Sequence, residues 1–278
     1  MTAKRIEGNR SQKAYEKAWL ETLDDDSRNL AWQRGVGMAI PDEKKWKKPP
    51  EVRIKICGLT SREEVRWVVE EKADYAGFVL FFPKSKRNLN VEQAGELLRE
   101  LKCLNLDRKT ERTRSVAVVV SPTKDQIRQI ECLGFDYIQI HGGIEKEAVC
   151  AINIPVIRAI HITDFPKEET SALRKTLKER IETEREYFDQ KITAFLFDAK
   201  EPGSGKMFDW NMLRELRTAK EKMILAGGLD PYNVREALNV VCPDVVDVSS
   251  GVEISRETIG KDREKIRQFI RKVRTDEQ

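Results

Sequence analysis

The sequence lacks the features that mark secreted and membrane proteins. No apolar run approaches the roughly 20 residues of a membrane span, and the N-terminus has no apolar core of a signal peptide. No two cysteines form a CxxC pair, and their odd number favours reduced thiols in a cytosol. The five are Cys57, Cys103, Cys132, Cys150 and Cys242. We therefore expect a cytoplasmic protein without a membrane partner.

The sequence also lacks a large excess of basic over acidic side chains, or of acidic over basic ones. The chain has 51 basic and 47 acidic side chains, a net charge of +4, without the concentrated basic stripe of a nucleic-acid binder. Charged residues still make up 35% of the chain, against roughly 25% in globular proteins. This composition excludes nucleic acid as the expected partner and favours a well-solvated surface with polar helices.

Residues 1–50 have a character of their own. Tyr15, Trp19 and Leu23 recur every four residues and so share one helical face, and residues 44–50 form a basic stretch that ends in two prolines. We expect residues 1–50 to be a partly helical arm and linker, and residues 51–278 to be the catalytic domain. An apolar helical face usually docks on something, so the arm leaves a homo-oligomer or a partner protein open.

From residue 52 onward, short apolar runs alternate with longer segments of helical period. The predicted strands lie at 53–57, 75–81, 115–120, 137–141, 156–160, 194–198, 223–226 and 245–248. The predicted helices lie near 61–72, 91–102, 123–133, 144–152, 167–190, 209–220, 231–240 and 260–273. Strict alternation predicts parallel strands with helical crossovers, and eight units in about 225 residues indicate a closed (β/α)8 TIM barrel. A doubly wound open sheet is the alternative, but no GxGxxG follows the first strand.

The predicted helix at 167–190 is unusually long and densely charged. Its charges recur at the spacing of helical neighbours, as in Lys178 and Glu182, and such pairs stabilise an exposed helix without any partner. We therefore interpret these charges as a solvated face.

In a (β/α)8 barrel the active site lies at the carboxyl ends of the strands. Glycines follow the seventh and eighth predicted strands, at Gly227, Gly228 and Gly251. Glycines are common in ordinary turns, but two such loops at the two strands where barrels often bind phosphate favour a phosphorylated substrate.

Two strand ends carry groups suited to proton transfer. Cys57 ends the first strand and is a usable general base if a cation such as Lys55 lowers its pKa; the alternative is a small buried hydrophobe. Asp198 ends the sixth strand, and an aspartate is rarely buried without a partner; the alternative is a cap for the following loop.

Arg87 lies in the loop after the second strand. Its planar guanidinium suits two-point binding of a carboxylate or a phosphate. Because Lys84 and Lys86 lie beside it, a solvated basic loop is an equally good interpretation.

Six segments then carry a specific resemblance. KICGLT, FFPKSKRN, QIHG, FDA with the following GSGKMFDW, AGGL and DVSSGVE occur in order at the strand ends. In this respect residues 52–272 resemble phosphoribosylanthranilate isomerases of tryptophan biosynthesis. The resemblance implies an Amadori rearrangement of N-(5-phosphoribosyl)anthranilate to 1-(2-carboxyphenylamino)-1-deoxyribulose 5-phosphate, with no metal or organic cofactor. Asn88 departs from the pattern, since an aromatic or β-branched residue is common there.

The resemblance also implies roles for individual residues. Cys57 corresponds to the general base that removes the C2′ proton, and Asp198 to the general acid that protonates the ribose ring oxygen. Arg87 corresponds to the residue that binds the anthranilate carboxylate, and Asp247 to an acidic residue near the sugar hydroxyls. The other substrate-binding positions are Gln139, His141 and, through their backbones, Gly227, Gly228, Ser250 and Gly251.

Two other functions compete with this prediction. The analogous isomerase of histidine biosynthesis uses carboxylates at both catalytic positions, so Cys57 argues against it. A non-catalytic, phosphate-binding barrel scaffold with a partner-binding arm is the other alternative, and the presence of both Cys57 and Asp198 argues against that.

Overall fold

A computed structural model describes residues 51–106, 108, 112–162, 170–198, 210, 213, 215–217, 220–255 and 258–275. All of them lie in one compact unit, Pro49–Gln278. The predicted arm at 1–50, the loop at 199–209 and half of the predicted helix at 209–220 lie outside the described residues. Within the described ranges, none of the helices has the length and apolar character needed to cross a membrane.

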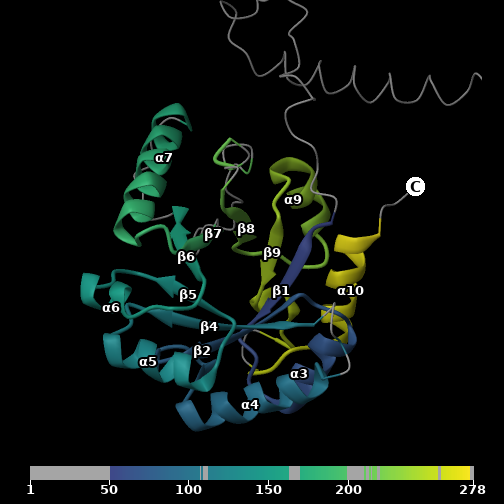
Figure 1. Ribbon diagram of the computed structural model, residues 1–278. Helices are drawn as coiled ribbons and strands as arrows, with labels where there is room; N and C mark the ends of the chain where they lie inside the picture. Colours follow the sequence, from purple (N-terminus) through teal and green to yellow (C-terminus); the bar gives the residue numbers. More distant parts are fainter. Residues whose placement is uncertain are drawn as a thin grey trace, which may run out of the picture. The chain divides into compact units, whose positions relative to one another are not determined.

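Eight parallel strands close into a barrel, which confirms the predicted TIM-barrel fold. They are β1 (Arg53–Cys57), β2 (Tyr75–Leu80), β4 (Arg114–Val120), β5 (Tyr137–His141), β6 (Val156–His161), β7 (Ile192–Asp198), β8 (Lys222–Ala226) and β9 (Val245–Val248). Strand β1 pairs with both β2 and β9, so the first and last strands lie side by side (Figure 1). A two-residue strand, β3 (Asn88–Leu89), adds to β2; it is too short to show an alternating pattern and was not predicted.

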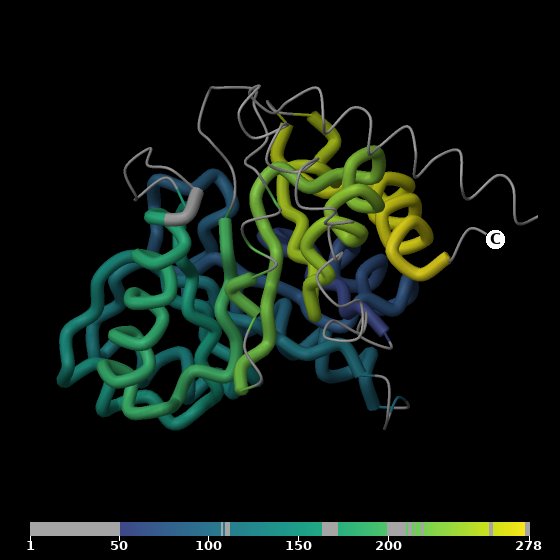
Figure 2. The backbone as a smooth tube through the Cα atoms, turned by 90° about the horizontal axis from the view of Figure 1, so that it is seen from above, coloured from purple at the N-terminus to yellow at the C-terminus, as the bar shows by residue number. Residues whose placement is uncertain are grey.

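Helices surround the strands in both views (Figure 1, Figure 2). They are α3 (Arg62–Glu70), α4 (Val91–Leu104), α5 (Lys124–Leu133), α6 (Lys146–Cys150), α7 (Thr170–Tyr187), α9 (Val234–Val241) and α10 (Arg263–Arg274). Three of them begin with reciprocal capping hydrogen bonds, in which Ser61, Asn90 or Thr123 pairs with the Glu or Gln three residues later. Such capping satisfies backbone N–H groups that have no partner within the helix, which fixes where these helices start.

Alternation along each strand decides which side chains enter the barrel, because successive side chains point to opposite faces. In β1, Ile54 and Ile56 face the helices and belong to the large outer core, whereas Lys55 and Cys57 face inward. A smaller inner core fills the barrel axis below the mouth. The same parity turns Asp198 and Asp247 inward from β7 and β9, toward the mouth of the barrel.

Helix α7 corrects the solvated-face interpretation of its charges. Glu184 and Arg185 are only 5% and 8% exposed. The guanidinium of Arg158, in β6, donates to both carboxylate oxygens of Glu184 at 2.8 and 3.0 Å, and Arg185 pairs in the same way with Glu221 at 2.8 and 2.7 Å. These two charges therefore bind the helix to the barrel, while Lys178 on the same helix is exposed.

Candidate active site

A cavity of about 670 Å³ opens at the carboxyl ends of the strands. It brings together nine of the ten residues that the sequence singles out, from six different strands or the loops that follow them. These nine are Cys57, Arg87, Gln139, His141, Asp198, Gly227, Gly228, Asp247 and Ser250. Gly251 does not line the cavity. A Cβ there would lie 2.0 Å from the carbonyl oxygen of Leu229, so Gly251 allows the turn after β9 to pack against the loop after β8.

A buried ion pair lies directly below Cys57. The Nζ of Lys55 donates to Oδ2 of Asp247 at 2.9 Å, and both side chains are buried. Gly77 of β2 makes room for them, because a Cβ there would lie 3.1 Å from Lys55 Nζ and 3.0 Å from Cys57 Sγ. The second carboxylate oxygen of Asp247 is buried and has no hydrogen-bond partner among the described residues. That oxygen is available to accept a hydrogen bond from a ligand.

The thiol of Cys57 is less acidic than the sequence suggested. Burial raises its pKa, and the nearby Lys55 ammonium opposes this shift without overcoming it. The condition set by the sequence analysis, a pKa lowered by a cationic neighbour, is therefore not met by Lys55 alone, because desolvation of the thiolate outweighs the effect of the Lys55 charge. Burial also lowers the pKa of Lys55, but Asp247 and Cys57 outweigh it and the net shift is upward, so Lys55 is an ammonium.

Polar side chains at the ends of β5, β6 and β7 form a chain along the cavity wall. Gln139 Nε2 lies 2.7 Å from His141 Nε2, and His141 Nδ1 lies 2.9 Å from His161 Nε2. His161 Nδ1 in turn lies 3.7 Å from Asp198 Oδ2. Burial, followed by His161, Lys55 and Arg158, lowers the pKa of His141 to about 3. If the Nε2 of a neutral His141 accepts from the Gln139 amide, its Nδ1 carries the proton and donates to Nε2 of His161. The ring proton of a neutral His161 then lies on Nδ1, the nitrogen that faces Asp198.

His161 is a cavity residue that the sequence analysis missed. The predicted strand ended one residue too early, at Ile160, whereas β6 continues to His161. Its signal was available: His161 has the same inward parity as Ile157 and Ala159, which belong to the inner core.

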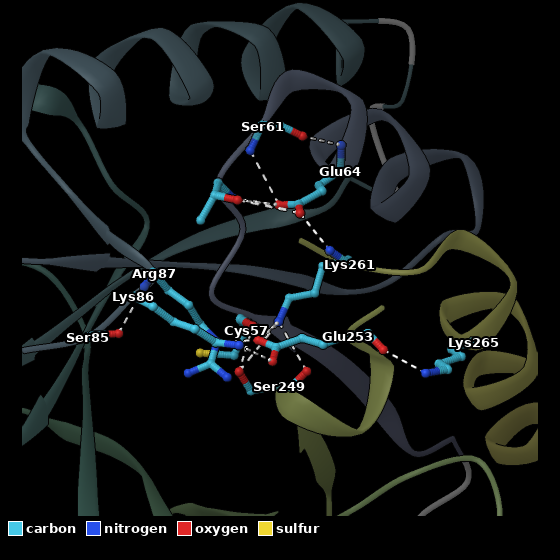
Figure 3. Close-up of polar contacts among 11 residues, drawn as sticks. Cys57, Ser61, Glu64, Ser85, Lys86, Arg87, Ser249, Glu253, Lys261 and Lys265 are labelled. Atoms are coloured by element: carbon cyan, nitrogen blue, oxygen red, sulfur yellow. Dashed lines mark hydrogen bonds and ion pairs between the residues drawn. The ribbon is translucent and has the colours of Figure 1, made fainter. Parts of the chain in front are cut away.

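Arg87 is held in place rather than free in a solvated loop. Its side chain lies across Gly58, where a Cβ would be 2.4 Å from Arg87 Cδ and where φ is +79°. Its Nε donates to Glu253 Oε1 at 2.5 Å, and Lys86 Nζ lies 3.1 Å from Glu253 Oε2 (Figure 3). Lys84 and Lys86 are both exposed, so the basic-loop interpretation fits these two lysines but not Arg87.

Asn88 shapes the same loop. Its side-chain oxygen accepts a hydrogen bond of 2.7 Å from the backbone N–H of Phe82, while its backbone pairs with Val79 of β2. Valine, isoleucine or phenylalanine at this position would have no side-chain oxygen to accept this bond. The departure from the family pattern thus closes the loop that carries Arg87.

The opposite side of the cavity is built from backbone. Gly227 and Gly228 have φ values of +96° and +71°, a conformation that favours glycine. The Asn233 side chain donates to the carbonyl oxygen of Gly228 at 2.8 Å, just before α9. Across the ranges that the structure describes, no three His, Cys, Asp or Glu side chains are grouped in a way that could hold a metal ion.

Polar side chains converging on the mouth of a closed (β/α)8 barrel define a TIM-barrel enzyme. Residues 54–272 match the family model of N-(5'phosphoribosyl)anthranilate (PRA) isomerase. The chain belongs to this family.

Individual relatives agree with that assignment. The N-(5'-phosphoribosyl)anthranilate isomerase of Streptococcus mutans is 36% identical over 223 residues, which cover 80% of this chain and 98% of the relative. The crystal structure of phosphoribosyl anthranilate isomerase from Thermotoga maritima is 33% identical, has a TM-score of 0.63, and is matched over 80% of this chain and 98% of its own. A further structure, of phosphoribosyl anthranilate isomerase in complex with reduced 1-(o-carboxyphenylamino)-1-deoxyribulose 5-phosphate, is 31% identical with a TM-score of 0.60 over the same shares.

Proposed function

We propose that this chain carries out its family's reaction with Cys57 as the general base and Asp198 as the general acid. The chain is an isomerase of tryptophan biosynthesis that converts N-(5-phosphoribosyl)anthranilate to 1-(2-carboxyphenylamino)-1-deoxyribulose 5-phosphate. The observation that carries the assignment is that both side chains face one cavity, from the ends of β1 and β7.

In the first step, Asp198 donates a proton to the ribose ring oxygen and the bond between that oxygen and C1′ breaks. The product is an open-chain Schiff base, protonated at nitrogen. Cys57 then takes the C2′ proton, and the electrons of that C–H bond form a C1′–C2′ double bond. The resulting enolamine becomes the ketone when C1′ gains a proton and the C2′ hydroxyl loses one. Each turnover thus leaves Asp198 one proton short and Cys57 with one extra.

Because burial raises the pKa of Cys57, we infer that this base is activated in the complex with substrate. The positive charge of the Schiff base develops beside the thiol and, together with Lys55, stabilises the thiolate. The same charge makes the C2′ proton more acidic. Both effects favour proton transfer only after the ring has opened.

The remaining residues bind the substrate. Arg87 binds the anthranilate carboxylate, for which a guanidinium gives two parallel hydrogen bonds. The free carboxylate oxygen of Asp247 accepts from a sugar hydroxyl, and Gln139 and His141 line the wall beside it. The backbones of Gly227, Gly228 and Ser250 form the phosphate cradle, and Gly251 lies in the turn that supports it.

The wider setting is proposed from the sequence. We place the enzyme in the cytoplasm, with a small phosphorylated molecule as its substrate and neither nucleic acid nor membrane as a partner. Residues 1–50 are proposed to act as an arm that docks on the catalytic domain, on a second copy or on a partner protein, without a part in the chemistry.

The test follows the fluorescence of freshly formed phosphoribosylanthranilate as the purified chain consumes it. Cys57→Ala and Asp198→Asn each remove one proton-transfer group with little change in volume, and losing such a group costs roughly 10²–10⁴-fold in rate. We expect kcat to fall in that range with the circular dichroism spectrum unchanged. A folded variant that keeps more than about a tenth of the wild-type kcat would remove that residue from the proposed mechanism.

A further inference from the structure

A buried carboxylate outside the proposed mechanism gathers three cations beside the substrate cavity. Glu253 is only 4% exposed and follows the short turn after β9, at Ser250–Val252. Its carboxylate contacts Arg87 Nε at 2.5 Å, Lys86 Nζ at 3.1 Å and Lys261 Nζ at 3.4 Å (Figure 3). Two of these cations come from the loop after β2 and the third from the segment before α10. Glu253 therefore joins three separate parts of the chain at one point.

Glu253 is itself fixed by the backbone around it. It forms an antiparallel bridge with Lys261, and the backbone N–H of Asp262 donates to the carbonyl oxygen of Val252 at 2.8 Å. The backbone N–H of Lys261 also donates to Glu64 Oε1 at 2.7 Å, while Lys261 Nζ donates to the Ser249 carbonyl oxygen at 3.1 Å (Figure 3). The carboxylate is thus a rigid anchor rather than a mobile surface group.

The charge balance leaves Arg87 able to bind an anion. Burial alone would raise the pKa of Glu253, but hydrogen bonds and charge from Arg87, Lys261 and Lys86 lower it overall, so the side chain is an anion. Even with Glu64, whose carboxylate also acts on Lys261, two negative charges do not neutralise three positive ones. The guanidinium is therefore held by its Nε while the cluster as a whole keeps an excess of positive charge at the cavity.

The contact with Glu253 fixes the orientation of the Arg87 guanidinium. Arginine is a long side chain with many rotamers, and two-point binding of a carboxylate needs its planar end in one orientation. Glu253 fixes the Nε edge of Arg87, and Gly58 supplies a flat backbone surface below the side chain. Arg87 lines the cavity in this orientation.

We propose that Glu253 is a positioning residue that orients Arg87 and thereby sets the selectivity of the enzyme for a substrate with an anthranilate carboxylate. This inference rests on the proposed role of Arg87. Glu253 acts through Arg87 and does not touch the substrate. Its removal should weaken the binding of the carboxylate and leave the proton transfers at Cys57 and Asp198 unchanged.

The experiment is a double-mutant cycle of Glu253→Gln and Arg87→Ala, with KM and kcat measured separately. Two substrates are compared, phosphoribosylanthranilate and phosphoribosylaniline, which lacks the carboxylate. Loss of the charge-assisted bond in Arg87→Ala should raise KM for the anthranilate substrate roughly ten- to a hundredfold. Glu253→Gln should raise it roughly three- to tenfold with kcat within about twofold, and should add less than about twofold in the Arg87→Ala background, because coupled residues are not additive.

The aniline substrate and a matched variant distinguish a specific effect on the orientation of Arg87 from a general disturbance of the backbone around Glu253. Glu253→Gln should leave KM for phosphoribosylaniline within about twofold, because the analogue has no carboxylate for Arg87 to bind. Lys265 Nζ donates to the backbone carbonyl oxygens of Glu253 and Ile254 at 2.7 and 3.2 Å. Lys265→Ala therefore disturbs the same backbone without removing the carboxylate, and its KM should stay near wild type.

The outcomes are distinguishable. If Arg87→Ala leaves KM unchanged, the proposed role of Arg87 fails. If Arg87→Ala raises KM but Glu253→Gln does not, the positioning role of Glu253 fails. It also fails if Glu253→Gln raises KM equally with and without Arg87, or equally for the two substrates. An equal rise in Lys265→Ala also overturns it. Should Glu253→Gln not fold, Glu253→Asp keeps the charge while shortening its reach, and the same comparisons apply.

Discussion

At the scale of single residues, strand parity decides which side chains can act on a substrate. Lys55 and Cys57 face inward from β1 while Ile54 and Ile56 pack against helices, and this division follows from the period of two alone. The sign of the Cys57 pKa shift does not follow from the sequence, because it depends on whether desolvation or the Lys55 charge dominates. Only the three-dimensional arrangement, with Gly77 leaving room for both groups, determines that balance.

His141 makes a residue-scale prediction about pH. Its folded pKa is lowered to about 3 from 6.5, so between these values the unfolded chain binds a proton that the folded chain does not. Stability from the neutral imidazole is complete above the unfolded pKa and is lost as the pH falls through this window. The loss between pH 7 and pH 5.5 is about 1 kcal/mol.

Urea unfolding of the wild type and of His141→Gln at both pH values checks this contribution. The groups around the imidazole are Gln139, His161 of β6, Lys55 of β1 and Arg158, and all of them remain in the variant. We expect the free energy of unfolding of the wild type to fall by about 1 kcal/mol more than that of the variant. Equal losses in the two proteins would mean that His141 takes up its proton in the folded state.

Glu253 and His161 mark the limit of what the sequence could predict about the site. Cys57, Arg87, Asp198, Gly227 and Gly228 were found because each lies at a strand end or in the loop that follows one, where barrel enzymes keep their chemistry. The family resemblance supplied the other four cavity residues, Gln139, His141, Asp247 and Ser250. Glu253 stood in a quoted motif, but its partner Arg87 is 166 residues away, and no local pattern reveals such a contact. His161 was lost to an error of one residue in a strand boundary, the least certain part of any sequence-based assignment.

At the scale of elements, helix α7 shows how a buried ion pair resembles a solvated one in sequence. Leu173, Leu177 and Ile181 form its apolar stripe, and Glu184 falls on the same stripe. An acid at that position needs a buried partner, and Arg158 in the apolar strand β6 supplies it. The pairing could have been suspected from these two misplaced charges, although the choice of partner requires the packing of α7 on β6.

This pair gives an element-scale prediction. Glu184→Ala leaves the buried Arg158 guanidinium without its carboxylate, which should lower the free energy of unfolding by about 3 kcal/mol. The matched control is Glu179→Ala, since Glu179 is 66% exposed and lies 3.9 Å from Lys175; exposed pairs of this kind contribute less than about 1 kcal/mol. Urea denaturation measures both. If the two variants lose the same stability, the Arg158–Glu184 pair does not anchor α7.

At the scale of the whole molecule, the alternation of strands and helices was enough to predict the closed barrel. All eight predicted strands begin and end within two residues of the observed ones, because a strand buried on both faces is a short apolar run between charged helices. The predicted arm at residues 1–50 lies outside the described residues and stays a prediction. Its basis is the face formed by Tyr15, Trp19 and Leu23.

Deleting residues 1–48 tests the arm. The residues proposed for catalysis and substrate binding all lie between Cys57 and Ser250 or in the turn that follows, so we expect a kcat close to that of the full chain. A short helix is marginal on its own and gains stability by packing; the truncated protein should therefore have a lower Tm or a different oligomeric state by light scattering. Unchanged Tm and assembly would contradict docking, and a folded but inactive product would contradict the arm's exclusion from the chemistry.

The pairing of β1 with β9 has one more consequence. Arg274, at the end of α10, lies 3.8 Å from Asp74 just before β2, and the Asp74 carboxylate accepts from the backbone N–H of Ile54 at 2.8 Å. The start of β1 and the end of α10 therefore both lie at the amino-terminal rim of the barrel, whereas the cavity opens at the carboxyl-terminal rim. A hydrogen-bonded ring of strands has no privileged starting point. The unit with which the chain begins is thus not fixed by the barrel, whereas the order of the units around it is. We expect a circularly permuted gene to encode the same catalytic mouth.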